Sequence, residues 1–127
     1  MKKLNILGYS YTLYTEVPMS DIPTDSPEDG GKNVGLTNLD TKEMWVASDM
    51  DKDQKDSVLI HEIIEAINYH LELNLQHNQI MALEVGLHQV FQDSGVELSP
   101  LLEESYLHDR TTGELNGTVL FKTESVA

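Results

Sequence analysis

Three residues near the middle of the chain have the types and spacing of metal ligands and a general base. His61, Glu62 and Glu65 lie within the segment His61-Glu62-Ile63-Ile64-Glu65. At 3.6 residues per turn of an α-helix, residues 61 and 65 stack on one face, so both side chains could reach one ion. Glu62 is turned by about 100° from His61, where its carboxylate could contact a water on that ion. The segment therefore predicts a metal site with an acid–base residue beside it.

A second segment offers side chains for the same site. Glu84 lies one helical turn before His88, and His77 lies two turns before Glu84 on nearly the same face. Two antiparallel helices would bring His61, Glu65 and Glu84 to one point, with the other two histidines in the groove or on the surface nearby. We predict these three residues as the ligands. Such a mixed nitrogen and oxygen set suits zinc, or manganese or iron, better than copper.

The apolar pattern predicts the two helices that this site requires. The first runs from about residue 53 to 73, with Asp49 or Asp51 as its N-cap and Asp53 in its first turn, where the helix dipole favours anions. The second runs from about residue 76 to 92, and the short link makes the pair an antiparallel hairpin with facing apolar stripes. The stripes are Ile60, Ile63, Ile64, Ile67 and Leu71 in the first helix, and Ile80, Leu83, Leu87, Val90 and Phe91 in the second. Met81 is also assigned to the core, and His70 is expected to be exposed on the opposite face from His61.

Strand-forming segments precede the helices. Residues 2–14 are rich in apolar and aromatic side chains, which favours one strand with a bend at Gly8. Residues 34–38 and 43–47 flank a short turn and predict a hairpin, whereas the Pro- and Gly-rich residues 17–33 predict a long loop. The expected fold is therefore α+β: an N-terminal antiparallel sheet of about three strands packed on the two-helix hairpin.

The length of 127 residues fits one domain. We assign residues 1–95 to that α+β domain. Residues 96–127 are expected to form a polar C-terminal extension, either partly disordered or folded into a short hairpin.

Composition excludes several classes of function. The formal net charge is −14 with only eight Lys and Arg residues, which excludes direct nucleic-acid binding because that needs clustered cations. The absence of cysteine excludes a disulfide framework and thiolate-bound zinc. We find no apolar run long enough to cross a membrane and no signal-peptide pattern after Met1-Lys2-Lys3, so we expect a cytoplasmic protein without membrane partners. The oligomeric state is left open.

The helical segments resemble small zincin-like metallopeptidases of bacteriophages and prophages. The likeness rests on residues 59–67 (LIHEIIEAI), 77–80 (HNQI) and 83–90 (LEVGLHQV), where that family looks like HEIIHAI followed by LExGLxQVL. Residues 5–12 (NILGYSYT) and the order of strands before the helix are also similar. The resemblance spans residues 2–93.

This resemblance implies zinc ligation by His61 and the residue at position 65, a general-base role for Glu62, and Glu84 as a third ligand. The chain departs from the family at position 65, where the zincin pattern has a second histidine. A carboxylate in place of imidazole leaves the ion less electrophilic, so its bound water is less acidic and hydrolysis is weaker.

We therefore expect a metal-dependent hydrolase of peptidase type and of phage or prophage origin, with a variant HExxE site. Its substrate would be a peptide or protein that pairs in extended form with the strand at 43–47. The alternative is a catalytically inactive, zincin-derived interaction module that binds a host or phage protein in the host cytoplasm. Glu65, the acidity and the polar loop at 17–33 favour this alternative. A third hypothesis, a nucleic-acid mimic, predicts salt-sensitive binding to a DNA- or RNA-binding protein.

Overall fold

The computed structural model describes residues 1–23 and 33–103. Within these ranges four strands precede two long helices and one short helix. The strands are β1 (Lys2–Ile6), β2 (Tyr9–Tyr14), β3 (Gly35–Asn38) and β4 (Glu43–Val46), with a 3₁₀ turn, η1 (Met19–Asp21), after β2. The helices are α1 (Lys52–Leu71), α2 (His77–Ser94) and α3 (Ser99–Leu102). The predicted α+β class is confirmed.

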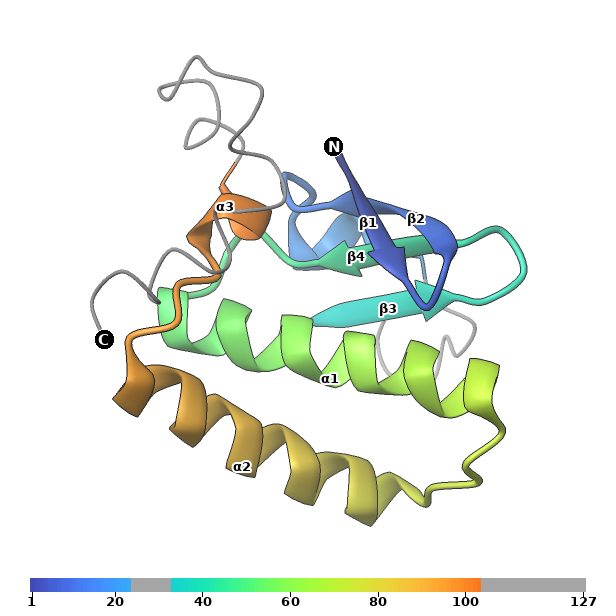
Figure 1. Cartoon of the computed structure of the whole chain (residues 1–127). Coiled ribbons are helices and arrows are strands. Elements are labelled where there is room, and N and C mark those ends of the chain that lie inside the picture. Colours follow the sequence, from blue (N-terminus) through green and yellow to red (C-terminus); the bar gives the residue numbers. More distant parts are fainter. Residues whose placement is uncertain (24–32, 104–127) are drawn as a thin grey trace.

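Helix α1 lies in the middle of three layers, with the sheet on one side and α2 on the other (Figure 1). The strand order is β1-β2-β4-β3, and the sheet is mixed rather than wholly antiparallel because β2 and β4 run parallel. The prediction that residues 43–47 form an edge is wrong, since β4 lies between β2 and β3. The edge strand that packs against α1 is β3.

Residues 2–14 form a hairpin, not one bent strand, which raises the strand number from about three to four. Ile6 pairs with Tyr9, so the turn consists of two residues, Leu7 and Gly8. Both have positive φ, 55° and 88°, as the tight turns of two-residue hairpins require. The Asn5 side chain accepts a hydrogen bond from the Gly8 N–H at 2.9 Å and holds the turn.

The helical hairpin is confirmed, and its ends have clear causes. Asp51, one of the two predicted N-caps, accepts a hydrogen bond from the Gln54 N–H at 2.9 Å, while the Gln54 side chain accepts from the Asp51 N–H. Helix α1 ends where Glu72 adopts a left-handed conformation, and α2 ends at Gly95 in the same way. No helix within residues 1–23 and 33–103 is long and apolar enough to cross a membrane.

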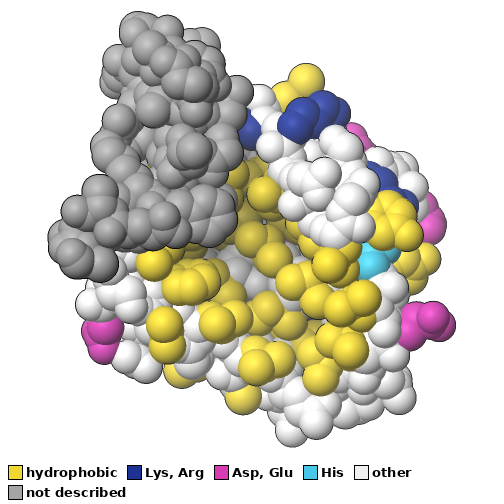
Figure 2. Space-filling view, viewed as in Figure 1, with side chains coloured by type: hydrophobic (Ala, Val, Ile, Leu, Met, Phe, Trp, Pro, Cys, Tyr) yellow, Lys and Arg dark blue, Asp and Glu magenta, His cyan; other side chains and the backbone are white. Residues whose placement is uncertain are grey.

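Helix α2 packs on α1 through only part of its predicted apolar stripe, since Ile80 is buried and Phe91 is half-buried. The side chains of Leu83, Leu87 and Val90, and that of Met81, are exposed, with values between 38% and 48%. Figure 2 shows that hydrophobic side chains gather on one face of the molecule. The α2 residues that are not exposed are Ile80, Glu84, His88 and Phe91, which recur at intervals of four, four and three. The prediction of Met81, Leu83 and Leu87 as core is therefore wrong.

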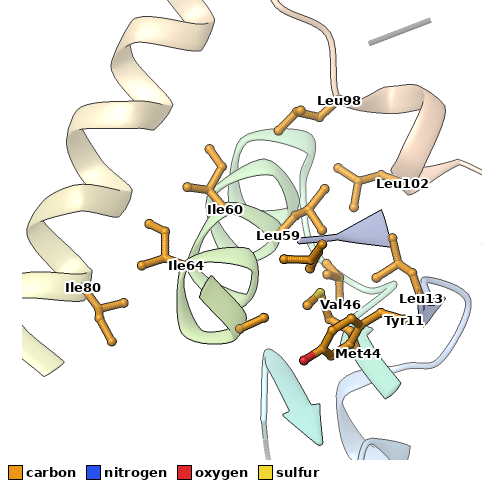
Figure 3. Packing of buried hydrophobic residues seen from close by; sticks show 12 residues of the cluster. Tyr11, Leu13, Met44, Val46, Leu59, Ile60, Ile64, Ile80, Leu98 and Leu102 are labelled. Carbon is orange, nitrogen blue, oxygen red and sulfur yellow. The ribbon is translucent and has the colours of Figure 1, made fainter. Parts of the chain in front are cut away.

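The apolar core lies between the sheet and α1. Tyr11, Leu13, Met44, Val46 and Leu59 are its largest fully buried side chains (Figure 3). Leu98 and Leu102, from α3 and the residue before it, pack into the same cluster. The core thus continues past residue 95, where we expected a polar extension to begin; residues 104–127 lie outside the described ranges.

His70 is half-buried rather than exposed, because the β1–β2 hairpin reaches the end of α1. Its ring stacks on Tyr9 with centroids 3.8 Å apart, and its Nε2 atom lies 2.7 Å from the Tyr11 hydroxyl oxygen. His70 therefore joins α1 to the sheet and takes no part in the groove between the helices.

Candidate metal site between the helices

The middle of the α2 face that meets α1 is polar, although apolar side chains flank it on both sides. Glu84 and His88 occupy the groove, while Leu83, Val85 and Leu87 of the same helix face solvent. Burying a carboxylate and an imidazole costs free energy unless they gain partners, and exposing apolar side chains forfeits stabilisation. A helix that half-buries polar side chains while it exposes large apolar ones is informative, because apolar side chains would gain more from that position. This inversion marks the α1–α2 groove as the candidate functional site.

His61 is the centre of this site. Its Nδ1 atom lies 2.8 Å from Glu84 Oε1, and its Nε2 atom lies 3.3 Å from Glu65 Oε2. Glu84 also accepts a hydrogen bond from the Ser57 hydroxyl. The side chains of His61 and Glu84 are 17% and 18% exposed, against 36% for Glu65. The structure therefore brings the three predicted ligands together, but Glu65 and Glu84 contact different ring nitrogens.

His77, from the first turn of α2, completes a possible ligand set. One ligand atom each from His61, Glu65 and His77 lies within 4.8 Å of the others, and the two rings are 5.9 Å apart in an edge-on arrangement. Two imidazoles and one carboxylate are a known ligand set of catalytic zinc. Ligand atoms about 2.1 Å from a tetrahedral ion stand about 3.4 Å apart, close to the observed distance between His61 and Glu65. These residues fit a zinc ion.

Glu84 suits a positioning role in this arrangement. A metal-binding histidine usually donates its second ring N–H to a carboxylate, which fixes the ring and raises its basicity. Glu84 contacts the Nδ1 atom of His61 in this way. The Nε2 atom, which lies near Glu65, then stays available to bind the metal ion. Ligation by Glu84 itself stays a prediction. Helical spacing placed His77 on the correct face of α2, but spacing alone does not rank it above Glu84 as a ligand.

The two arrangements predict different losses of zinc affinity. If Glu84 only positions His61, Glu84→Gln should weaken zinc binding about 10- to 100-fold, the range for residues behind a ligand. His77→Ala should weaken it further, because a ligand is lost. Isothermal titration of both variants with zinc measures the order. A larger loss in Glu84→Gln than in His77→Ala would instead make Glu84 the ligand.

His61 carries a raised pKa in the metal-free protein. Burial lowers the pKa of the imidazole, but the hydrogen bond to Glu84 and the charges of Glu62, Glu84 and Glu65 together outweigh that effect. The groove thus attracts a positive charge at His61. Because a metal ion must displace the proton, zinc binding is expected to strengthen as pH rises.

Glu62 lies on the sheet side of α1. Its Oε1 atom accepts a hydrogen bond from the Thr37 hydroxyl of β3 at 2.7 Å, and only 8% of the residue is exposed. Burial raises the pKa of this carboxyl to about 7, although the Thr37 hydrogen bond lowers it. Its nearest partner is therefore a strand residue, which the sequence did not indicate. A carboxyl of this pKa can accept and return a proton near neutral pH.

Gly35 allows β3 to approach α1 closely at this point. A Cβ atom at position 35 would lie 2.5 Å from Val58 Cγ1, 3.1 Å from the Trp45 backbone oxygen and 3.2 Å from Glu62 Oε2. Gly35→Ala should therefore lower the free energy of unfolding by about 1–3 kcal/mol, measured by urea denaturation. The loss should be smaller in a Val58→Ala background, because the shortest contact is then removed. An equal loss in both backgrounds would contradict this explanation.

An open pocket of about 610 Å³ runs along the edge strand, near Glu62. Leu36, Thr37 and Asn38 of β3 line it, together with Trp45 of β4 and Tyr69 of α1. Its volume lies within the range of small-ligand and peptide sites. The pocket therefore adjoins Thr37, the β3 residue that donates a hydrogen bond to Glu62.

Comparison with known proteins gives no relative: no family model matches the chain, and no curated protein and no solved structure shows significant similarity. The resemblance to zincin-like metallopeptidases therefore stays a prediction. The geometry of the α1–α2 groove and of Glu62 supports the proposal below.

Proposed function

We propose that this protein is a zinc-dependent hydrolase of the peptidase type. The observation that carries the proposal is the cluster of His61, Glu65 and His77, with Glu84 behind His61, in a groove where polar side chains lie among apolar ones. His61 and Glu65 come from one turn of α1, and His77 comes from the facing end of α2. The earlier set of His61, Glu65 and Glu84 is the alternative arrangement of ligands. Manganese or iron would suit either set.

Bound zinc would polarise a carbonyl group and make water more acidic. Glu62 would take the proton from the attacking water and return it to the leaving amine, since its pKa of about 7 suits both transfers. To reach that water, the Glu62 carboxylate would turn from Thr37, which donates a hydrogen bond to it on the sheet side of α1, towards the groove. In the alternative set of His61, Glu65 and Glu84, the second carboxylate would make the zinc-bound water less acidic and hydrolysis slower.

The proposed substrate-binding site is the free edge of β3. An extended peptide can pair with a free strand edge through its backbone and place alternate side chains in a neighbouring pocket. The described part of β3 forms such an edge, and the pocket beside Thr37 and Trp45 would receive side chains. A peptide or protein is therefore the proposed substrate.

The test is hydrolysis of a library of internally quenched peptides. We expect slow cleavage in the presence of zinc, loss of cleavage with a chelator, and recovery on adding zinc back. Absence of cleavage in a protein that carries a stoichiometric amount of zinc at His61 would contradict the hydrolase and leave the metal site standing.

A second candidate function, an interaction module without catalysis, has a specific observation in its favour. Helix α2 exposes Met81, Leu83, Val85, Leu87 and Val90, which form apolar surface of the kind that binds another protein. A phage or host protein would be the partner, in the cytoplasm of the host. Zinc binding without hydrolysis would favour this function.

A further inference from the structure

A second cluster of metal-binding side chains lies at the other end of the α1–α2 groove. One ligand atom each from Asp53, Asp56 and His88 lies within 4.8 Å of the other two. Asp53 and Asp56 are three residues apart in the first turns of α1, so their side chains share a face. The second half of α2 lies beside the start of α1 because the helices are antiparallel (Figure 1), and His88 belongs to that half.

Two polar atoms of this cluster are buried without a hydrogen-bond partner among the described residues. They are Asp56 Oδ1 and His88 Nε2. Asp56 as a whole is only 5% exposed. An unsatisfied buried acceptor costs about 1–3 kcal/mol, and more for a charged group. Both atoms are of the type that binds a cation, and both belong to the same small cluster, so one ion would satisfy them together.

The remaining contacts of the cluster leave those atoms available. Lys52 Nζ lies 2.8 Å from Asp56 Oδ2 and 3.1 Å from Glu97 Oε1. Gln92 Nε2 donates to Asp53 Oδ1 at 3.1 Å. Thus Asp56 is anchored through Oδ2 and keeps Oδ1 free, while Asp53 keeps its second oxygen.

The charge and space at this end also suit a divalent cation. Asp53, Asp56 and Glu97 supply three carboxylates against the single ammonium of Lys52, which leaves a negative excess. A pocket of about 250 Å³ adjoins the cluster and is lined by Asp56, His88 and Phe91, among others. This volume holds an ion together with the waters that would complete its coordination.

We propose that Asp53, Asp56 and His88 form a second, independent divalent-cation site. One imidazole nitrogen and two carboxylate oxygens suit zinc or a similar first-row transition ion, whereas calcium and magnesium prefer all-oxygen sites. The ion would join the start of α1 to the second half of α2, so it would stabilise the helical hairpin. This site is separate from His61 and does not depend on hydrolytic activity.

The experiment counts zinc ions by equilibrium dialysis of the metal-free protein. Wild type should bind two zinc ions per chain. His88→Gln should bind one and His61→Ala should bind one, whereas the double variant should bind none. Asp53→Asn is the milder second variant, because Asp53 is exposed and its replacement leaves the packing intact; it should weaken the second site at least 10-fold. Circular dichroism of each metal-free variant verifies folding.

Thermal unfolding supplies a second readout that does not depend on counting. In the His61→Ala background zinc should raise the unfolding temperature, because it binds the native state only. Adding His88→Gln or Asp53→Asn should abolish that rise. If His88→Gln binds as much zinc as wild type, or if zinc does not stabilise His61→Ala, the second site does not exist. A water molecule between Asp56 and His88 would then account for the two buried atoms.

Discussion

Glu62→Gln is expected to lower the rate of zinc-dependent peptide hydrolysis by about 10²- to 10⁴-fold, the usual contribution of a general base. An amide cannot accept the proton of the attacking water. It is close in size to the protonated carboxyl, so the contact with Thr37 and the packing against β3 should persist. The rate is measured with the internally quenched peptides under saturating zinc.

Two controls separate this effect from loss of metal or loss of fold. The zinc content of Glu62→Gln should equal that of wild type, since Glu62 is not in the ligand cluster. Glu16→Gln, which changes an exposed carboxylate far along the chain, should leave the rate unchanged. Undiminished hydrolysis in Glu62→Gln would remove Glu62 from the mechanism.

The same substitution should stabilise the metal-free protein above neutral pH. The pKa of Glu62 rises from its ordinary 4.5 to about 7 because the carboxyl is buried. The folded state thus keeps a proton that the unfolded chain releases, so the free energy of unfolding falls as pH rises from about 4.5 to 7. By pH 8 the loss is about 3 kcal/mol. Glutamine cannot ionise and avoids this loss.

Urea denaturation at pH 5 and pH 8 measures the difference. At pH 5 the two proteins should differ by about 1 kcal/mol or less, and at pH 8 Glu62→Gln should be more stable by about 3 kcal/mol. The raised pKa of His61 also makes the free energy of unfolding fall as pH rises. The free energy of unfolding of Glu62→Gln should therefore still fall with pH, but less than that of wild type. Identical pH dependence in both proteins would show that burial does not raise the pKa of Glu62. Lower activity with higher stability is the usual signature of a functional residue held in an unfavourable place.

Much of the helical part of the fold could be predicted because its signals are local. The apolar spacing and the Asp51 cap located α1, and the short link before α2 required an antiparallel hairpin. The two-residue turn at Leu7 and Gly8 was missed, because aromatic residues continue on both sides of it and resemble one strand. The edge strand was misplaced for another reason: parallel pairing of β2 with β4 is a long-range arrangement that periodicity within each strand does not reveal.

Hydrophobicity alone predicted the wrong face of α2 for packing against α1. Counting apolar residues on α2 selects the face of Leu83 and Leu87. The helix packs instead through the face that carries Ile80, Glu84, His88 and Phe91. The proximity of His61, Glu65 and Glu84 was predictable from the i, i+4 spacing and the hairpin. Their arrangement was not, because it depends on which ring nitrogen each carboxylate meets. The role of Asp56 in the second cluster could not be predicted from the sequence, because acidic residues near a helix N-terminus usually lie in solvent.

The most direct test of the central claim is the zinc content of wild type compared with His61→Ala. His70→Gln is the matched control, because this histidine lies on the same helix but contacts Tyr9 and Tyr11 instead of the groove. We predict that His61→Ala binds one zinc ion fewer per chain than wild type, and that His70→Gln binds the same number. Equal zinc binding by wild type and His61→Ala, or no zinc in either, would contradict a metal site between the helices.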